Sequence, residues 1–230
     1  MHLDFAKQKL LFDPATSGIK KVVIYGIGSV GSHAAENLAK AGFQQIEIWD
    51  YDKVEGDNLA AQAYWEKHIG MLKVDALKEI LETTANVTPI IHNEKITKDT
   101  VLMFEPQTLY WCGIDDSRAR KIVWDKLKIY PNVMFVDTRI GQFNMCYRFI
   151  DTSDKDWVED FEKILGPDRP HVDLECGEKC CNPVNNGLVA LAIGNIFNII
   201  MGNDYFKFFF HNLLVSQPTF VKADKKFELL

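Results

Sequence analysis

Residues 21–62 read KVVIYGIGSVGSHAAENLAKAGFQQIEIWDYDKVEGDNLAAQ, and this stretch decides the fold of the chain. It contains, in order, an apolar run, a glycine-rich turn, a helical segment and a second apolar run, at residues 22–25, 26–31, 29–41 and 46–49. Apolar runs of this length predict strands, and the segment between them suits a helix that Gly42 ends. The stretch therefore predicts a strand, a turn, a helix and a second strand.

The turn carries three glycines at the spacing G-x-G-x-x-G, namely Gly26, Gly28 and Gly31. The first permits a tight turn, the second lets backbone approach a phosphate, and the third lets helix and strand pack closely. The helix N-terminus offers free N–H groups and a partial positive charge to that phosphate. Asp50 ends the second strand about 20 residues later, where a carboxylate that binds a ribose belongs. The pattern predicts a bound nucleotide, and the alternative is a tight turn without a ligand.

Helices and strands continue to alternate after this unit. Helices are expected at 71–83 and 118–129, and strands at 87–92, 107–112 and 133–137. This alternation predicts a Rossmann-like α/β fold, with a doubly wound and mainly parallel sheet.

The pattern changes after residue 140. A strand is expected at 142–150, a polar helix or loop at 153–165, a surface loop at 166–183, an apolar helix at 185–201 and one or two strands around 216–218. No linker divides the chain, so residues 1–230 are expected to form a single domain. Its nucleotide-binding core covers about 20–140, and a C-terminal β/α elaboration covers about 141–230.

The composition is that of an ordinary globular protein, with 47% hydrophobic and 25% charged residues among 230. The formal net charge of −6 gives no general attraction for DNA or for an anionic membrane. The N-terminus lacks the pattern of a signal peptide, and no apolar run reaches the roughly 20 residues that span a bilayer. The apolar residues 188–201 are interrupted by polar ones, which predicts a buried core helix. A cytoplasmic protein with reduced cysteines is expected.

The polar segment 51–70 and the motifs after it separate this chain from a dehydrogenase. They read D-x-D-x-V-x-x-x-N-L-x-x-Q at 50–62, I-G-x-x-K at 69–73 and D-D-S-x-x-R at 115–120. This series resembles the ThiF/MoeB superfamily of adenylating enzymes, to which ubiquitin-activating enzymes belong, over about residues 20–140. The resemblance implies a parallel sheet with a nucleotide at its switch point. It also implies attack of a carboxylate on the α-phosphate of ATP, which gives an acyl adenylate and pyrophosphate. The carboxylate is commonly the C-terminal glycine of a small ubiquitin-like or sulfur-carrier protein.

By position, the resemblance assigns eight residues to the nucleotide site. They are Gly26, Gly28, Ser29, Gly31, Asp50, Asn58, Lys73 and Asp115. Asp50 resembles the acid that binds the ribose hydroxyls, and Asn58 resembles an amide that faces the phosphates or the metal. Lys73 resembles the catalytic lysine that neutralises phosphate charge, and Asp115 resembles the catalytic acid that binds Mg²⁺. Nucleotidyl transfer concentrates negative charge, which cations and fixed donors stabilise.

Four of the motif residues also have structural interpretations. Lys73 opens an amphipathic helix and could be a solvated surface lysine. Asn58 could be the N-cap of a helix, and Asp115 could cap the helix that starts near residue 117. Arg120 is expected to be structural and paired with an acid near the turn.

Three acids fall at the carboxyl ends of predicted strands, namely Asp50, Asp115 and Asp137. Ligands of doubly wound sheets lie outside these ends, so the three acids suggest a metal or hydroxyl site. Turns also favour aspartate for local hydrogen bonding, which is the alternative.

The chain departs from the superfamily pattern at several positions. The arginine of N-L-x-R-Q is Ala61 here, which removes a guanidinium expected to contact the phosphates. Arg139, near the carboxyl edge of the sheet, is a candidate substitute. Ser29 replaces a glycine of the turn, and the N-terminal region offers Lys7 and Lys9 where many relatives have an arginine. These losses favour a weak, specialised or partner-dependent enzyme.

Three of the five cysteines lie in residues 171–183, which read HVDLECGEKCCNP. Zinc is not expected there, because no CxxC pair is present and adjacent cysteines chelate poorly. The nominal zinc ligands are His171, Cys176, Cys180 and Cys181. Cys180 or Cys181 could instead be a catalytic nucleophile that forms a thioester, since Lys179 and the following helix N-terminus favour a thiolate. The remaining alternative is that these are unreactive loop cysteines. Cys112 and Cys146 are expected to have packing roles.

The sequence thus predicts an ATP-dependent adenylyltransferase that acts on a ubiquitin-like or sulfur-carrier protein, with ATP and Mg²⁺ as cofactors. A peptide or modified tRNA base is an alternative substrate, and a non-catalytic nucleotide-binding relative is an alternative function. An NAD-dependent oxidoreductase is disfavoured by the segment 51–73. A homodimer is expected because the aromatic residues 206–210 (FKFFF) supply apolar surface, although these phenylalanines could equally fill the core.

Overall fold

The computed structural model describes residues 3–8, 12–165, 182–214 and 217–224. Its centre is one eight-stranded sheet with the order β3-β2-β1-β4-β5-β6-β7-β8. The strands are β1 (Lys21–Tyr25), β2 (Ile46–Trp49), β3 (Ile90–His92), β4 (Thr108–Cys112), β5 (Met134–Gly141), β6 (Asn144–Asp151), β7 (Phe206–Asn212) and β8 (Thr219–Lys222). The predicted α/β fold is confirmed.

The first five strands in the chain are parallel, and the last three are added antiparallel. β1 lies between β2 and β4, so the chain moves outward to β3 and then crosses back over β1 to β4. This reversal is the switch point of a doubly wound sheet, where ligands bind outside the carboxyl ends of the strands. The glycine turn follows β1 and therefore lies at this point.

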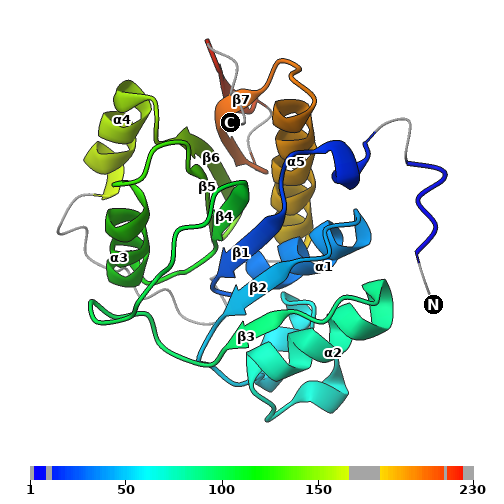
Figure 1. Ribbon diagram of the computed structural model, residues 1–230. Helices are drawn as coiled ribbons and strands as arrows, with labels where there is room; N and C mark the ends of the chain where they lie inside the picture. The colour runs from blue at the N-terminus through cyan, green and yellow to red at the C-terminus, as the bar shows by residue number, and fades with distance from the viewer. Residues whose placement is uncertain (1–2, 9–11, 166–181, 215–216, 225–230) are drawn as a thin grey trace.

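Five α-helices lie among the described residues: α1 (Gly31–Lys40), α2 (Lys73–Ala85), α3 (Ser117–Leu127), α4 (Lys155–Leu165) and α5 (Asn182–Ile200). Figure 1 shows α3 and α4 on one side of the sheet and α1 and α5 on the other. The central strands are consequently covered on both faces, and every residue of β4 is buried. This explains why β1, β2 and β4 read as continuous apolar runs rather than as alternating ones.

Three short 3₁₀ helices complete the described secondary structure. They are η1 (Pro14–Thr16), η2 (Gly56–Ala60) and η3 (Glu66–His68). The last two lie in the segment 51–70, which the sequence identifies only as polar.

Two strands begin or end at other residues than expected, because an adjacent residue or a paired strand sets the boundary. β3 begins only at Ile90, directly after Pro89, which has no N–H for a ladder hydrogen bond. β5 continues past Asp137 to Gly141, because β6 folds back and pairs with it along its whole length. The tail forms a hairpin of β7 and β8, in agreement with the predicted one or two strands.

α5 is long and apolar enough to cross a membrane by length and composition alone, the one such helix among the described residues. Half of its most apolar window is buried inside the fold, and it contacts α1, β5 and β6. Asn195 on α5 donates hydrogen bonds to the Tyr147 hydroxyl on β6 and to the carbonyl of Phe206, at 2.9 Å and 2.7 Å. α5 therefore packs as the buried core helix that the sequence predicts.

Candidate nucleotide site

Two glycines of the turn are required by the packing of the protein itself. Gly26 has a φ angle of +79°, and a Cβ there would lie 2.9 Å from the backbone of Ile114. A Cβ on Gly31 would lie 2.0 Å from the carbonyl oxygen of Gly26. A side chain at either position would force the turn apart, so the predicted roles of tight turn and close packing are confirmed.

Gly28 differs, because a Cβ there would meet nothing within 4 Å and its φ angle lies outside the left-handed region. The next helix, α1, also starts without a side-chain cap: Val30 occupies the N-cap position and makes no capping hydrogen bond. An uncapped helix leaves N–H groups available to an anion. Gly28 therefore faces open space beside the N-terminus of α1, as expected of a phosphate-binding turn.

Asp50 is positioned against the glycine turn. Its Oδ2 accepts the N–H of Ile27 at 2.9 Å, and its Oδ1 accepts the N–H of Asp52 at 2.9 Å. Burial raises the pKa of the Asp50 carboxyl, while Lys73 and the two N–H donors oppose this shift. Each oxygen keeps acceptor capacity for a further donor, such as a hydroxyl.

Lys73 is the first residue of α2 and is 7% exposed, so it is not a solvated surface lysine. Its Nζ lies 3.1 Å from Oδ2 of Asp52, and its backbone N–H donates to the carbonyl of Asp52 at 2.9 Å. The structure therefore brings Lys73, Asp52 and Asp50 together beside the glycine turn. Asp52 belongs to the D-x-D motif, and its contact with Lys73 is a role that the sequence did not predict.

The side chain of Tyr64 holds the segment 51–73 against the glycine turn, a role that the sequence did not predict. Its hydroxyl donates to the carbonyl of Ile27 at 2.7 Å, and the N–H of Ala63 donates to the hydroxyl of Ser32 at 3.1 Å. Burial raises the pKa of Tyr64 well above its ordinary value, so the hydroxyl keeps its proton for this bond. A tyrosine in a polar segment carries no sequence signal for such a role.

The structure places Asn58 within η2, where it stabilises the turn. Its Oδ1 accepts the N–H of Glu55 at 3.0 Å, and its Nδ2 donates to Asp57 at 2.9 Å. The proposed N-cap interpretation is wrong in detail, because Glu55 is the N-cap and Asn58 is the third residue of the turn. None of its hydrogen bonds is to the glycine turn or to Lys73.

Asp115 and Asp116 follow β4 and precede α3. Asp116 is the N-cap: its Oδ1 accepts the N–H groups of Arg118 and Ala119 at 2.7 Å and 3.4 Å. The interpretation of Asp115 as the cap is therefore wrong. Asp115 is exposed and makes no hydrogen bond or ion pair within the described part of the chain. It lies one residue after Ile114, whose backbone packs against Gly26.

Asp137 is fully buried and forms ion pairs with Arg120 and Arg139. Burial opposes its ionisation, but the two guanidinium groups hold the pKa of its carboxyl below the ordinary value. The grouping of Asp137 with Asp50 and Asp115 in a metal or hydroxyl site is therefore wrong, since its carboxylate is fully buried and its charge is already balanced by two guanidinium groups. The expectation that Arg120 is structural and paired with an acid is confirmed.

The candidate thioester cysteines Cys180 and Cys181, like Cys176 and His171, lie outside the described residues. Cys112 is fully buried, and Cys146 is half-buried. Burial raises the pKa of both thiols. Within the described ranges no group of three or more His, Cys, Asp or Glu side chains is arranged to hold a metal ion.

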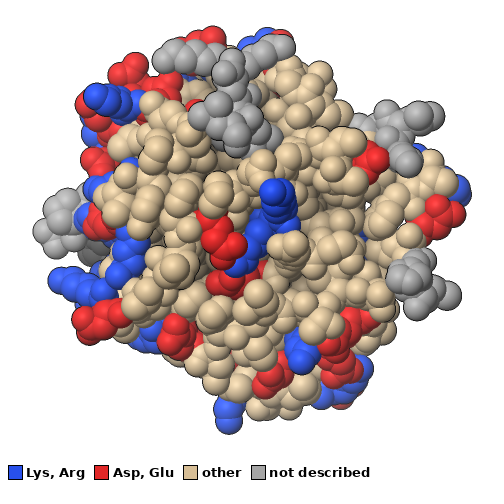
Figure 2. Space-filling model, viewed as in Figure 1, with Lys and Arg blue, Asp and Glu red and all other residues tan. Residues whose placement is uncertain are grey.

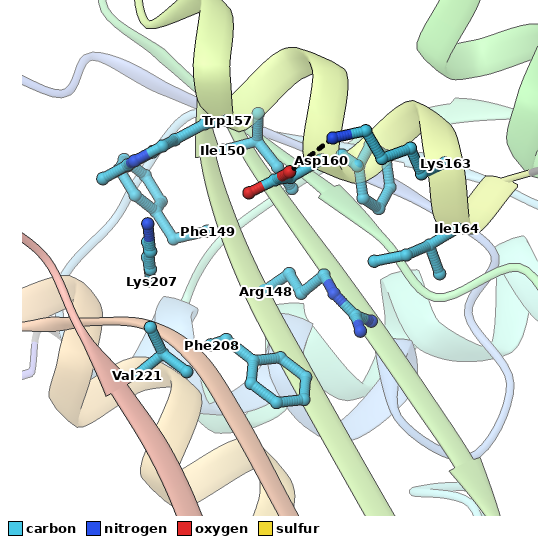
Figure 3. Close-up of a pocket in the computed structure, with 11 residues that line it drawn as sticks. Arg148, Phe149, Ile150, Trp157, Asp160, Lys163, Ile164, Lys207, Phe208 and Val221 are labelled. Carbon is cyan, nitrogen blue, oxygen red and sulfur yellow. Dashed lines mark hydrogen bonds and ion pairs between the residues drawn. The ribbon is translucent and has the colours of Figure 1, made fainter.

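A separate cavity of about 360 Å³ lies between α4 and the strands β6–β8. Figure 3 shows its lining, with Arg148, Lys207 and the ion pair of Asp160 and Lys163 around apolar side chains. None of the predicted site residues lines it. Figure 2 shows acidic and basic side chains interspersed on the face in view, without an extended patch of one sign.

A doubly wound sheet with a tight glycine turn, an uncapped helix and a buried lysine at its switch point is an arrangement typical of nucleotide-binding α/β proteins. Residues 17–203 match the ThiF family, and the chain belongs to that family.

Relatives agree with this assignment. Ubiquitin-like modifier-activating enzyme 5 of Caenorhabditis elegans is 35% identical over 79 residues, which is 34% of this chain and 19% of that protein. Adenylyltransferase and sulfurtransferase MOCS3 of Aedes aegypti is 31% identical over 218 residues, which is 86% of this chain and 47% of that protein. The chain spans about a fifth to a half of the length of these relatives.

Solved structures share the fold. A crystal structure of E. coli MccB with ATP aligns with a TM-score of 0.67 and 16% identity, over 90% of this chain and 64% of that one. The structure of PaaA aligns with a TM-score of 0.67 and 17% identity, over 90% of this chain and 74% of that one.

Proposed function

We propose that this protein is an ATP-dependent adenylyltransferase that activates a carboxylate as an acyl adenylate and releases pyrophosphate. The C-terminal carboxylate of a ubiquitin-like or sulfur-carrier protein is the substrate that the named relatives support best. Membership of the ThiF family supports the reaction class.

The observation that carries the proposal is Gly28. The fold explains Gly26 and Gly31 by contacts within the protein, whereas no protein atom requires a glycine at position 28. A ligand that approaches the backbone beside the uncapped N-terminus of α1 would explain why this residue is a glycine. The residues around it suit a nucleoside triphosphate, because Asp50 offers carboxylate oxygens and Lys73 a buried positive charge.

When bound, ATP supplies the activated phosphorus and the pyrophosphate leaving group. Asp50 would hold the ribose hydroxyls, and the N–H groups at the start of α1 would bind phosphate oxygens. Lys73, oriented by Asp52, would offset charge that develops on the phosphates. Asp115, an uncommitted carboxylate at the same edge, would hold Mg²⁺, since carboxylate oxygens are ligands that this ion prefers.

The test is calorimetry with MgATP and with NAD on wild-type protein and on Gly28→Ala. The wild type should bind MgATP and not NAD. A methyl group at position 28 meets no protein atom, so Gly28→Ala should keep the thermal stability while it weakens ATP binding by about tenfold or more, that is about 1.4 kcal/mol. Tighter binding of NAD than of ATP by the wild type would contradict the proposal. Unchanged ATP affinity in the folded variant would remove the observation on which it rests.

A further inference from the structure

The buried carboxylate of Asp137 binds two guanidinium groups, so the cluster of Arg120, Asp137 and Arg139 carries one excess positive charge. Nε of Arg139 donates to Oδ2 of Asp137 at 2.8 Å. Arg120 donates to the other oxygen of the same carboxylate. The side chain of Asp137 is fully buried, that of Arg120 is 5% exposed and that of Arg139 is 30% exposed. Arg139 is therefore the member of the cluster that a ligand can reach, and an anion bound there would balance the excess charge.

The two arginines differ in how their donors are satisfied. Arg120 also donates to the carbonyls of Ile114 and Thr138, so its guanidinium is held by backbone on both sides. Arg139 has its Nη2 shielded from solvent and without an acceptor among the described residues. A shielded donor of a charged group that lacks an acceptor is destabilising, and an anion that reaches it would remove this penalty.

The position of Arg139 identifies the edge of the sheet at which such an anion would lie. Asp137 pairs in register with Cys112, the last residue of β4. Arg139 therefore lies on β5 two residues beyond the level at which β4 ends. The chain that leaves β4 there, Gly113 and Ile114, packs against Gly26 of the glycine turn. Through the Ile114 carbonyl, the arginine cluster is therefore joined to the wall of the nucleotide site.

The other described arginines do not fit this task. Arg118 is exposed on α3. Arg148 lies over the ring of Phe208 at 4.5 Å, donates to Sγ of Cys146 at 3.0 Å, and lines the separate cavity. Position 61, beside the uncapped helix, holds an alanine whose carbonyl accepts Nδ2 of Asn185 at 2.7 Å.

We propose that Arg139 is a phosphate-binding residue of the nucleotide site, with Nη2 donating to a phosphate oxygen of ATP and Asp137 fixing the guanidinium. This inference rests on the proposed function, because it assigns a residue to the binding of its nucleotide. Arg139 takes part by binding and not by proton transfer. Asp137 is a positioning residue, since it acts through Arg139.

The test is calorimetry with ATP and with adenosine on wild type, Arg139→Gln, Arg139→Lys and the control Arg148→Gln. Arg139→Gln should weaken ATP binding by about tenfold to a hundredfold, the worth of a charged hydrogen bond, with adenosine affinity unchanged. Arg139→Lys keeps the charge but loses the fork that reaches Asp137 and phosphate together, so its loss should be smaller. Arg148→Gln should bind ATP like the wild type.

The outcomes separate this inference from the proposed function. If the wild type binds ATP and a folded Arg139→Gln binds it equally well, the inference is wrong and the proposed function stands. If adenosine affinity falls as much as ATP affinity, Arg139 is structural and the inference is again wrong. If the wild type binds no ATP, the proposed function fails first. If the melting transition shows that Arg139→Gln does not fold, the binding of ATP and of adenosine is compared on Arg139→Lys instead. Equal ATP affinity of Arg139→Lys and the wild type then overturns the inference.

Discussion

Asp115 and Asp116 show how adjacent residues of one type take different tasks. Asp116 caps α3 with two hydrogen bonds, whereas Asp115 makes none within the described ranges. The helix therefore does not need Asp115, and its carboxylate remains available to a cation. Lys73 presents the opposite case, since its ammonium is buried and already paired with Asp52. Both residues belong to the edge of the sheet at which the glycine turn lies.

We expect Lys73→Ala and Asp115→Ala each to reduce carboxylate-dependent exchange of ATP with pyrophosphate by about 10²-fold or more. Loss of one preorganised group that stabilises charge has a typical effect of this size. The matched control is Asp116→Asn, because asparagine also caps helices and should leave the exchange rate close to that of the wild type. Wild-type exchange in either alanine variant, measured with a carboxylate that the wild type activates, would refute its role.

Among the elements, η2 and η3 are built alike although their sequences differ. In each, a residue with φ −112° and ψ 162° precedes the turn, and the side chain at the third position accepts its N–H. Asn58 performs this task for Glu55 at 3.0 Å, and Nδ1 of His68 performs it for Trp65 at 3.0 Å. One turn is therefore held by an amide that does not titrate and the other by an imidazole that does.

His68 should make the stability of the protein depend on pH. Burial lowers the pKa of His68, and Nδ1 cannot take a proton while it accepts the Trp65 N–H. Below the ordinary value of about 6.5 the unfolded chain therefore binds more protons than the folded one, and the free energy of unfolding falls as pH falls. In His68→Asn, which copies the bond of Asn58, the decrease in melting temperature between pH 7.5 and 5.5 should be smaller. An equal or steeper decrease would show that His68 does not cause the dependence.

The elements that sequence reasoning placed correctly depend on local pattern. The strands β1, β2 and β4 and the helices α1 and α3 follow from apolar runs, caps and glycines. The residues that it misjudged depend on distant partners. The ion pair of Asp137 with Arg120 could not be predicted from local pattern, because the two residues lie 17 positions apart. The hydrogen bond of Tyr64 to Ile27 could not be predicted either, because these residues lie 37 positions apart. The length of β5 likewise depends on β6, which no pattern within residues 133–137 records.

At the scale of the whole molecule, the antiparallel end of the sheet leaves apolar side chains exposed. Phe209 is buried, but Phe210 and Phe220 are 38% and 44% exposed, and every residue of β8 is exposed. The phenylalanines of β7 therefore fill the core only in part. β8 is also the last strand of the sheet order, so its outer edge has no neighbouring strand within the described residues.

We expect the protein to be a homodimer that uses this surface, because exposed apolar side chains on an edge strand favour association. Light scattering at tens of micromolar should give twice the monomer mass of 26.3 kDa. A lysine in place of Phe220 should shift the protein toward the monomer, whereas Ile90→Lys, at the opposite edge β3, should not. A monomer mass for the wild type would exclude the homodimer.

The segment that follows Asp52 is closed at its base. Lys53 and Leu72 form an isolated antiparallel bridge, Val54 and Met71 are hydrogen-bonded at 2.9 Å, and Lys73 returns to Asp52. The two ends of the segment are thus held together by contacts at its base, and each doubling of the length of such a loop adds only about 0.6 kcal/mol of closure cost. Insertions or deletions between residues 55 and 62 that spare Tyr64 should therefore leave Lys73 beside Asp52, so this stretch of the surface can vary in length during evolution without moving the lysine.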